Sequence, residues 1–192
     1  MRICVFSGSS HGYAPEYKAA AQALGGLLAR NSIELVYGGA AVGLMGALAD
    51  ATLAEGGRVT GVIPQALVDR EVAHAGLTHL HVVSSMHERK SLMARLADGF
   101  IALPGGIGTF EELFEVWTWA QLGSHARPCA LLNVLGFYDH LLDFLDRVVE
   151  QGFLKKVHRE MLLVDKEPAP LLRAMGRYRA PVETKWIDPA RT

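Results

Sequence analysis

The chain has 192 residues, half of them hydrophobic, and a formal net charge of −1 at pH 7. Such an apolar composition excludes a disordered chain, and the balanced charge provides no global field that would attract nucleic acid or an anionic membrane. The length predicts one domain over residues 1–192, large enough for a substantial core.

The two cysteines, Cys4 and Cys129, both lie in apolar runs typical of buried strands, so we expect small buried side chains and no disulfide framework. The N-terminal residues enter a strand pattern directly and form no signal peptide. No apolar run reaches membrane-spanning length. We therefore expect a cytoplasmic protein without a membrane segment.

Short apolar runs alternate with amphipathic segments along the chain. Strands are predicted over 3–6, 33–37, 58–63, 79–83, 100–103, 129–133 and 161–164. Helices are predicted over 15–30, 44–54, 86–97, 110–122, 138–150 and 170–175. Residues 65–78 read as irregular or partly helical, and the tail from 179 as loosely held. The alternation predicts an α/β fold with a doubly wound, mostly parallel sheet and helices on both faces.

Glycine-rich turns follow three of the predicted strands, at Gly8, at 38–46 and at 104–108. Ligands of such sheets bind beyond the carboxyl ends of the strands, so these turns are expected to converge on one crevice. No turn is a P-loop or a dinucleotide-binding fingerprint, because the required Lys-Ser/Thr and acidic partners are missing. For turn 38–46, tight packing of a helix on a strand and contact with a ligand are both compatible with the pattern.

The turn 104–108 leads into the helix predicted to open at Thr109, and it is the most informative segment. Its glycines allow backbone N–H groups to approach a ligand, and the helix N-terminus adds a partial positive charge, which suits a phosphate. Glu112 then lies about one helical turn away. Thr109-x-x-Glu112 is also a capping box, a structural role that is compatible with the first.

Arg89 and Lys90 lie near the start of the helix predicted over 86–97, where cations oppose the helix dipole. Local rules broken in this way often mark functional sites. Because this turn lies at the same sheet edge as turn 104–108, Arg89 and Glu112 are expected to face each other across a phosphate-binding crevice. A surface salt bridge is the alternative.

Two further patterns concern metals and partners. His79 and His81 share one face of a strand, which we interpret as a half-exposed strand face, and no metal site is predicted. The helix over 110–122 is apolar around nearly its whole circumference, more than one sheet can cover. This predicts a partner subunit, with the helix around Trp117 and Trp119 in the interface.

Three elements together resemble motifs of a known family. The family motif PGGxGTxxE is matched by Pro104-Gly105-Gly106-x-Gly108-Thr109-x-x-Glu112, and its upstream Arg-Lys element by Met86-x-x-Arg89-Lys90. The turn Gly38-Gly39 through Gly43-Leu44-Met45-Gly46 resembles GGGxxGLMG. The chain is thus similar, from Ile3 to about Val164, to the "lonely guy" (LOG) family of cytokinin riboside 5′-monophosphate phosphoribohydrolases, often mislabelled lysine decarboxylases. It departs from the family pattern at Ala40, where a third glycine is usual, and at Ser7, where cysteine is common.

The resemblance implies a Rossmann-like nucleotide-binding domain, a homodimer and no cofactor. It implies hydrolysis of the N-glycosidic bond of an adenine-type nucleoside 5′-monophosphate, a cytokinin nucleotide or AMP, to free base and ribose 5-phosphate. Arg89 and Glu112 correspond to the catalytic pair. The residues that correspond to substrate contacts are Glu71, Lys90, Gly105, Gly106, Ile107, Gly108, Thr109 and Thr118. The sequence leaves three roles open for Arg89: neutralising phosphate, orienting Glu112, or assisting departure of the base.

Two other functions are weighed against hydrolysis. A pyridoxal-phosphate decarboxylase needs a Schiff-base lysine in a phosphate site, and Lys90 alone lies near a motif, with nothing to pair with the pyridine nitrogen. A non-catalytic nucleotide or molybdenum-cofactor carrier of related fold is the serious alternative. The combination of Met86–Lys90 with Glu112 favours the hydrolase.

Overall fold

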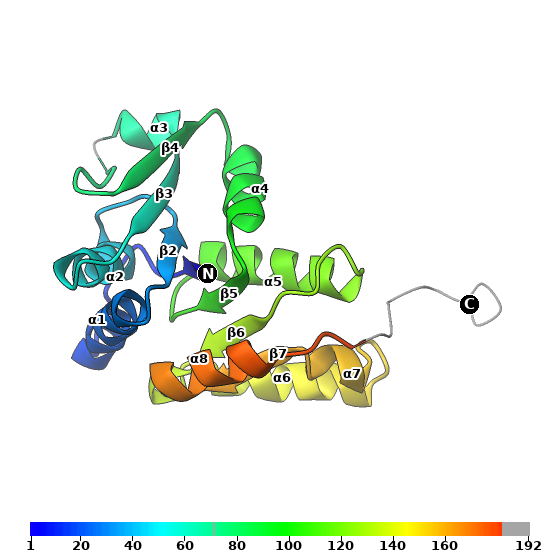
Figure 1. The fold of residues 1–192 in the computed structure, drawn as a ribbon. Coiled ribbons are helices and arrows are strands. Elements are labelled where there is room, and N and C mark those ends of the chain that lie inside the picture. The colour runs from blue at the N-terminus through cyan, green and yellow to red at the C-terminus, as the bar shows by residue number, and fades with distance from the viewer. Residues whose placement is uncertain (71, 182–192) are drawn as a thin grey trace.

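The computed structural model describes residues 1–70 and 72–181, and these form one seven-stranded sheet with helices on both faces (Figure 1). The strand order is β4-β3-β2-β1-β5-β6-β7, and every pairing is parallel. The predicted α/β fold is therefore confirmed. The sequence predicts a mostly parallel sheet, and within the described residues the sheet is wholly parallel.

The strands are β1 (Arg2–Phe6), β2 (Glu34–Tyr37), β3 (Val59–Pro64), β4 (His79–Val83), β5 (Gly99–Ala102), β6 (Cys129–Leu132) and β7 (Leu162–Asp165). The α-helices are α1 (Pro15–Arg30), α2 (Gly43–Ala54), α3 (Gln65–Val68), α4 (Met86–Leu96), α5 (Ile107–Gln121), α6 (Asp139–Glu150), α7 (Lys156–Arg159) and α8 (Pro168–Arg177). A 3-10 turn, η1, covers Val134–Gly136. All seven predicted strands and all six predicted helices are confirmed to within three residues at each end.

Side chains alternate across the sheet and build two cores. Along β1, Ile3 and Val5 join the core beneath α1, α2 and α8, whereas Cys4 and Phe6 join the core beneath α4, α5 and α6. Both cysteines are free and buried, as expected. None of the described helices is long and apolar enough to cross a membrane.

The strand order reverses between β1 and β5, which is where such sheets bind ligands. The backbone connects the three glycine turns at this point. Gly8 N donates to Pro104 O at 3.1 Å, and Leu44 N donates to Gly8 O at 3.0 Å. The predicted convergence of the turns is confirmed.

Tyr138 supports the strand that ends at the third turn. Its buried hydroxyl donates to Leu103 O at 2.6 Å, and its backbone N donates to Asn133 Oδ1 at 2.7 Å. Its ring also meets Phe110 of α5 edge-on, with the ring centroids 6.1 Å apart. The end of β5 and the first turns of α5 are therefore held by the same side chain.

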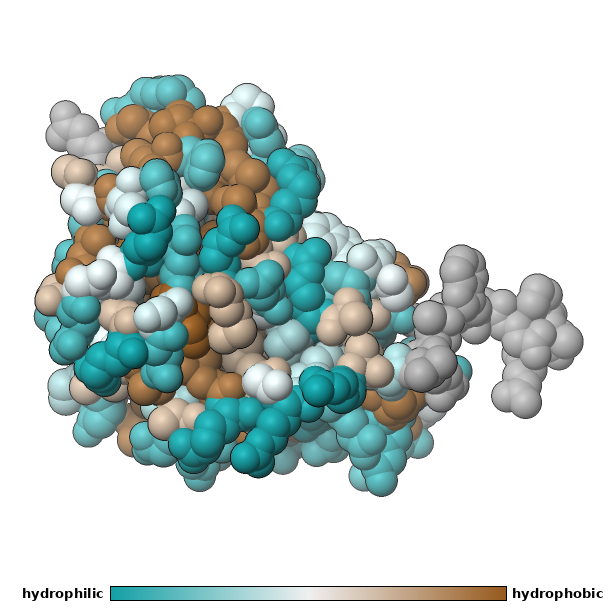
Figure 2. Space-filling model, viewed as in Figure 1, coloured by the Kyte–Doolittle hydropathy of each residue, from teal (hydrophilic) through white to brown (hydrophobic). Residues whose placement is uncertain are grey.

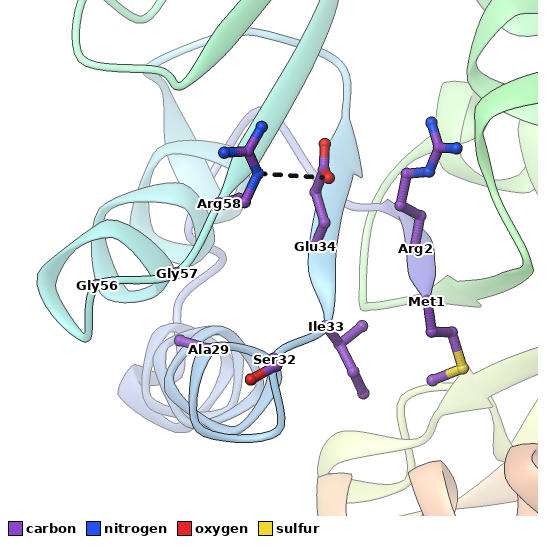
Figure 3. Close-up of a pocket in the computed structure, with 9 residues that line it drawn as sticks. All are labelled: Met1, Arg2, Ala29, Ser32, Ile33, Glu34, Gly56, Gly57 and Arg58. Carbon is purple, nitrogen blue, oxygen red and sulfur yellow. Dashed lines mark ion pairs between the residues drawn. The ribbon is translucent and has the colours of Figure 1, made fainter.

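The opposite edge of the sheet, where the strands begin, holds a cavity of about 320 Å³ (Figure 3). Arg2, Glu34 and Arg58 line it, with Arg58 Nε 3.7 Å from Glu34 Oε2. Thr60 Oγ1 donates to Glu34 Oε1 at 2.6 Å. The Glu34 carboxylate is therefore already paired, with Thr60 of β3 and with Arg58 directly before that strand. None of the predicted site residues lines this cavity.

Candidate functional site

A buried ion pair joins α4 to α5. Arg89 Nη1 lies 3.2 Å from Glu112 Oε1, and the two side chains expose only 10% and 9% of their surface. Arg89 Nε also donates to Val62 O, within β3, at 3.1 Å. The expected juxtaposition is confirmed, and the alternative of an exposed surface salt bridge is wrong.

Burial raises the pKa of the Glu112 carboxyl above its ordinary value. The Arg89 guanidinium opposes this rise and lowers that pKa, as does Lys90 to a smaller extent, whereas the Glu111 and Glu115 carboxylates raise it. Burial raises the pKa of the Cys4 thiol well above its ordinary value, the Glu112 carboxylate raises it further, and the Arg89 guanidinium lowers it. Glu112 is thus a buried carboxyl whose protonation depends on the cations beside it, as in many sites of acid–base chemistry.

The Lys90 ammonium group pairs with two other carboxylates of α5. Its Nζ pairs with Glu111 and lies 3.2 Å from Glu115 Oε2, and its side chain is 9% exposed. The hydrogen bond to Glu111 raises the pKa of the Lys90 ammonium group, so it stays charged. Two consecutive cations of α4 therefore pair with three carboxylates of α5.

The helix α5 begins earlier than the sequence indicates. Gly106 is its N-cap, in an extended conformation (φ −95°, ψ −158°), and no side chain caps the helix. The predicted Thr109–Glu112 capping box is therefore wrong. The reason is that the glycine turn enters helical geometry at Ile107, which puts Thr109 in the first turn with its hydroxyl packed on Gly105.

This early start leaves donors free at the end of the crevice. The first intrahelical bond runs from Phe110 N to Gly106 O at 3.2 Å, so the N–H groups of Ile107, Gly108 and Thr109 have no partner within the helix. A Cβ atom at Gly106 or Gly108 would meet open space. The predicted phosphate seat thus has the donors and the access that an anion requires.

Two further features border this turn. A cavity of about 270 Å³ is lined by the glycine turns and by the rings of Tyr17 and Phe137. Ser7, directly before Gly8, is buried, and its Oγ has no hydrogen-bond partner in the described part of the chain. Because buried hydroxyls are nearly always paired, such an orphan at the reversal of strand order is consistent with a bound ligand.

One predicted site residue, Thr118, lies apart from the pair. Thr118 is exposed on α5, six residues beyond Glu112 and hence about 9 Å further along the helix axis. Glu71 lies outside the described residues. The structure thus assembles Arg89, Lys90, Glu112 and the turn 105–109, and it leaves Thr118 apart.

The sequence analysis missed the cap of α4. Ser85 is its N-cap and accepts from Glu88 N at 3.2 Å, while Glu88 Oε2 accepts from Ser84 N at 2.8 Å. The signal was present, because Ser85-x-x-Glu88 is a capping box. This cap offsets the unfavourable dipole interaction of the two cations that follow it.

Trp117 lies on the helix predicted to form a subunit interface, and its side chain is buried within its own chain. Trp117 is 2% exposed, and its Nε1 donates to His158 O of α7 at 3.1 Å. The four-residue α7, too short to show a periodic pattern, thus supplies a partner for Trp117 from within the same chain. Trp119 is only partly buried.

The two histidines of β4 lie on an exposed face of the strand. His79 and His81 are exposed, and His79 Nε2 contacts Arg58 Nη2 at 2.8 Å. Across residues 1–70 and 72–181 there is no group of three or more His, Cys, Asp or Glu side chains that could hold a metal ion.

Solved structures show the same fold. The molybdenum cofactor carrier protein of Chlamydomonas reinhardtii superposes with a TM-score of 0.70 at 19% identity, over 92% of this chain and 96% of that one. At this identity the likeness concerns the fold alone.

Sequence comparison is more specific. The chain is 49% identical over 177 residues to a cytokinin riboside 5′-monophosphate phosphoribohydrolase of Arabidopsis thaliana, covering 92% of this chain and 82% of the relative. It is also 49% identical over 166 residues to the enzyme of that name from Rhodococcoides fascians, covering 86% and 84%. The profile of a family described as "possible lysine decarboxylase" matches residues 45–175. With this identity over nearly its whole length, the chain belongs to the family of cytokinin riboside 5′-monophosphate phosphoribohydrolases.

Proposed function

We propose that the protein hydrolyses the N-glycosidic bond of adenine-type nucleoside 5′-monophosphates, namely cytokinin riboside 5′-monophosphate, AMP or both, to free base and ribose 5-phosphate. The observation that carries this proposal is the buried Arg89–Glu112 pair beside the uncapped N-terminus of α5. The identity of 49% to named phosphoribohydrolases supports the same reaction.

The substrate phosphate binds the turn Gly105–Gly106–Ile107–Gly108–Thr109. The free N–H groups at the start of α5 and the positive end of the helix dipole favour a dianion there. Anchoring the phosphate fixes the ribose, so binding energy remote from the reacting carbon contributes to positioning.

Glu112 acts at the sugar. Glycosidic cleavage passes through an oxocarbenium-like state with positive charge on the ribose. A nearby carboxylate can stabilise this charge, or it can activate the attacking water. Both roles need the ionised carboxylate, yet burial favours the protonated form. Arg89 counters that effect from 3.2 Å, so of its three possible roles we favour orienting Glu112 and keeping it ionised.

The other family-implied contacts keep their proposed roles. Lys90 lies one residue from Arg89, and its ammonium group adds positive charge beside the crevice. For Glu71 and Thr118 the resemblance alone supports contact with substrate. No step of this reaction requires a cofactor.

We also propose a homodimer and a cytoplasmic location. Leu122, directly after α5, is 49% exposed, and Trp119 is incompletely covered. Around β4 and the start of α4, Leu80, Val82 and Met86 are 40–47% exposed, and Figure 2 shows hydrophobic surface gathered where these elements lie. These surfaces, rather than Trp117, are the ones available to a second copy. The location rests on the two free, buried cysteines.

The purified protein should release free base from AMP or from isopentenyladenosine 5′-monophosphate, and Glu112→Gln should lower kcat by roughly 10²- to 10⁴-fold while nucleotide binding is largely kept. The amide fills the same space but cannot stabilise the cationic sugar. Chromatography of the released base and calorimetric binding measure the two effects. Glu160→Gln, at an exposed carboxylate beyond α7, is the control. Near-normal turnover by a folded Glu112→Gln protein contradicts the assignment, and nucleotide binding without any base release by the wild type favours a carrier.

Removal of the 5′-phosphate should lower kcat/KM by roughly 10²- to 10⁴-fold, since two charge-assisted hydrogen bonds contribute about 1.5–3 kcal/mol each. The comparison is between isopentenyladenosine and its 5′-monophosphate under identical conditions. Equal rates for the two would show that the phosphate seat at α5 is wrongly assigned.

Neutralising the charges around Glu112 should move its pKa in opposite directions. Lys90→Met removes a cation that favours the carboxylate, so the pKa of Glu112 rises and the acidic limb of the pH–rate profile moves to higher pH. Glu115→Gln removes a carboxylate that disfavours it, so the same limb moves to lower pH. Carboxyl ¹³C NMR titration checks both shifts without reference to turnover. Shifts of the same sign in both variants would refute this electrostatic account.

Leu122→Asp should lower the dimer fraction at micromolar concentration, because a charge at a closed apolar contact has no compensation. Turnover should fall with it, since α5 also carries Glu112. Sedimentation velocity measures the dimer fraction. Phe153→Asp, at an 84% exposed residue beyond α6, is the matched control. A fully active wild-type monomer would rule out the proposed assembly.

A further inference from the structure

Gly38 directly follows β2 and opens the glycine turn 38–46. The positive φ values of this turn belong to Gly39, at +77°, and to Gly43, at +57°, whereas Gly38 is not in the left-handed region. Its backbone conformation is therefore open to any L-residue, and another reason must account for glycine here.

That reason is the Arg89 side chain. A Cβ atom built on Gly38 would overlap Arg89 Nη2, and it would lie 3.2 Å from both Arg89 Cζ and Met45 Sδ. Each nitrogen of the guanidinium thus has its own neighbour. Nε donates to Val62 O, Nη1 pairs with Glu112, and Nη2 lies against the bare Cα of Gly38.

We propose that Gly38 is a positioning residue for the reaction: its missing side chain forms the space that holds the Arg89 guanidinium against Glu112. The kinetic consequence rests on the proposed hydrolase function. The steric relation between Gly38 and Arg89 holds whatever the protein's function is.

Two other glycines of the turn, Gly43 and Gly46, lie too close to neighbouring main-chain atoms to accept a side chain. A Cβ at Gly43 would strike the backbone of Ser9 and Ser10, and one at Gly46 the backbone of Ala41. Such clashes require main-chain movement, which threatens the fold. At Gly38 the obstacle is the far end of a flexible side chain, so the protein can relieve it by moving Arg89 alone. Substitution of Gly38 should therefore weaken the Arg89–Glu112 contact without forcing the main chain to move.

The first test is Gly38→Ala. We expect a folded protein whose melting temperature falls by several degrees, because the buried Arg89–Glu112 contact is weakened. We also expect a fall in kcat of at least about tenfold with a smaller change in KM, because an interaction made chiefly in the transition state is lost. Gly176→Ala, on α8 where a Cβ meets nothing within 4 Å, should change neither quantity. Gly39→Ala, at a positive φ, should lower the melting temperature markedly.

A second readout separates Gly38 from the proposed function. Displacing Arg89 removes the main cation that favours the Glu112 carboxylate, so ¹³C NMR titration should show a raised pKa for Glu112 in Gly38→Ala. In an Arg89→Met background no guanidinium remains to be displaced. There, adding Gly38→Ala should leave the Glu112 titration unchanged, giving a double-mutant cycle with strong coupling.

Three results would overturn the proposal: wild-type turnover and titration in Gly38→Ala, additive shifts in the cycle, or a loss of stability from Gly38→Ala that persists in the Arg89→Met background. If the wild type released no base but Gly38→Ala still raised the pKa of Glu112, the role of Gly38 toward Arg89 would stand and the hydrolase function would fall.

Discussion

The buried pair of Arg89 and Glu112 is the constraint on which the surrounding structure depends. Removing both charges from water is costly, and the loss of one partner from such a pair typically costs about 3–5 kcal/mol. The geometry must therefore satisfy both groups at once. Arg89 does so through Glu112 and the Val62 carbonyl, beside the space left by Gly38. The pair thus ties β2, β3, α4 and α5 to one arrangement.

The topology explains how residues from distant segments reach this arrangement. Because all the described strands are parallel and the order reverses at β1 and β5, their following turns gather at one edge of the sheet. The glycine turn after β5 places Glu112 at this edge, and the capped start of α4 after β4 places Arg89 there. The opposite edge carries charges that already pair with one another, such as Arg58 with Glu34.

Much of this could be predicted from the sequence, because strand and helix periods, glycine turns and the break of the dipole rule by Arg89 are local signals. What these signals missed depended on tertiary contacts. The start of α5 at Ile107 depends on an extended Gly106, and the burial of Trp117 on a four-residue helix far along the chain. The role of Gly38 leaves no local trace, since the residue it accommodates lies fifty-one positions later.

A buried ion pair is seldom the most stable solution, since apolar side chains of similar volume often serve stability as well or better. Its presence here, with Lys90 and two more carboxylates beside it, is better explained by chemistry than by packing. Burial alone would leave Glu112 protonated over a wider pH range, and the cations of α4 oppose this. A carboxylate kept ionised at a buried position interacts strongly with positive charge that develops nearby, because burial reduces dielectric screening. The cost of the pair in folding and its use at a cationic sugar therefore have the same physical origin.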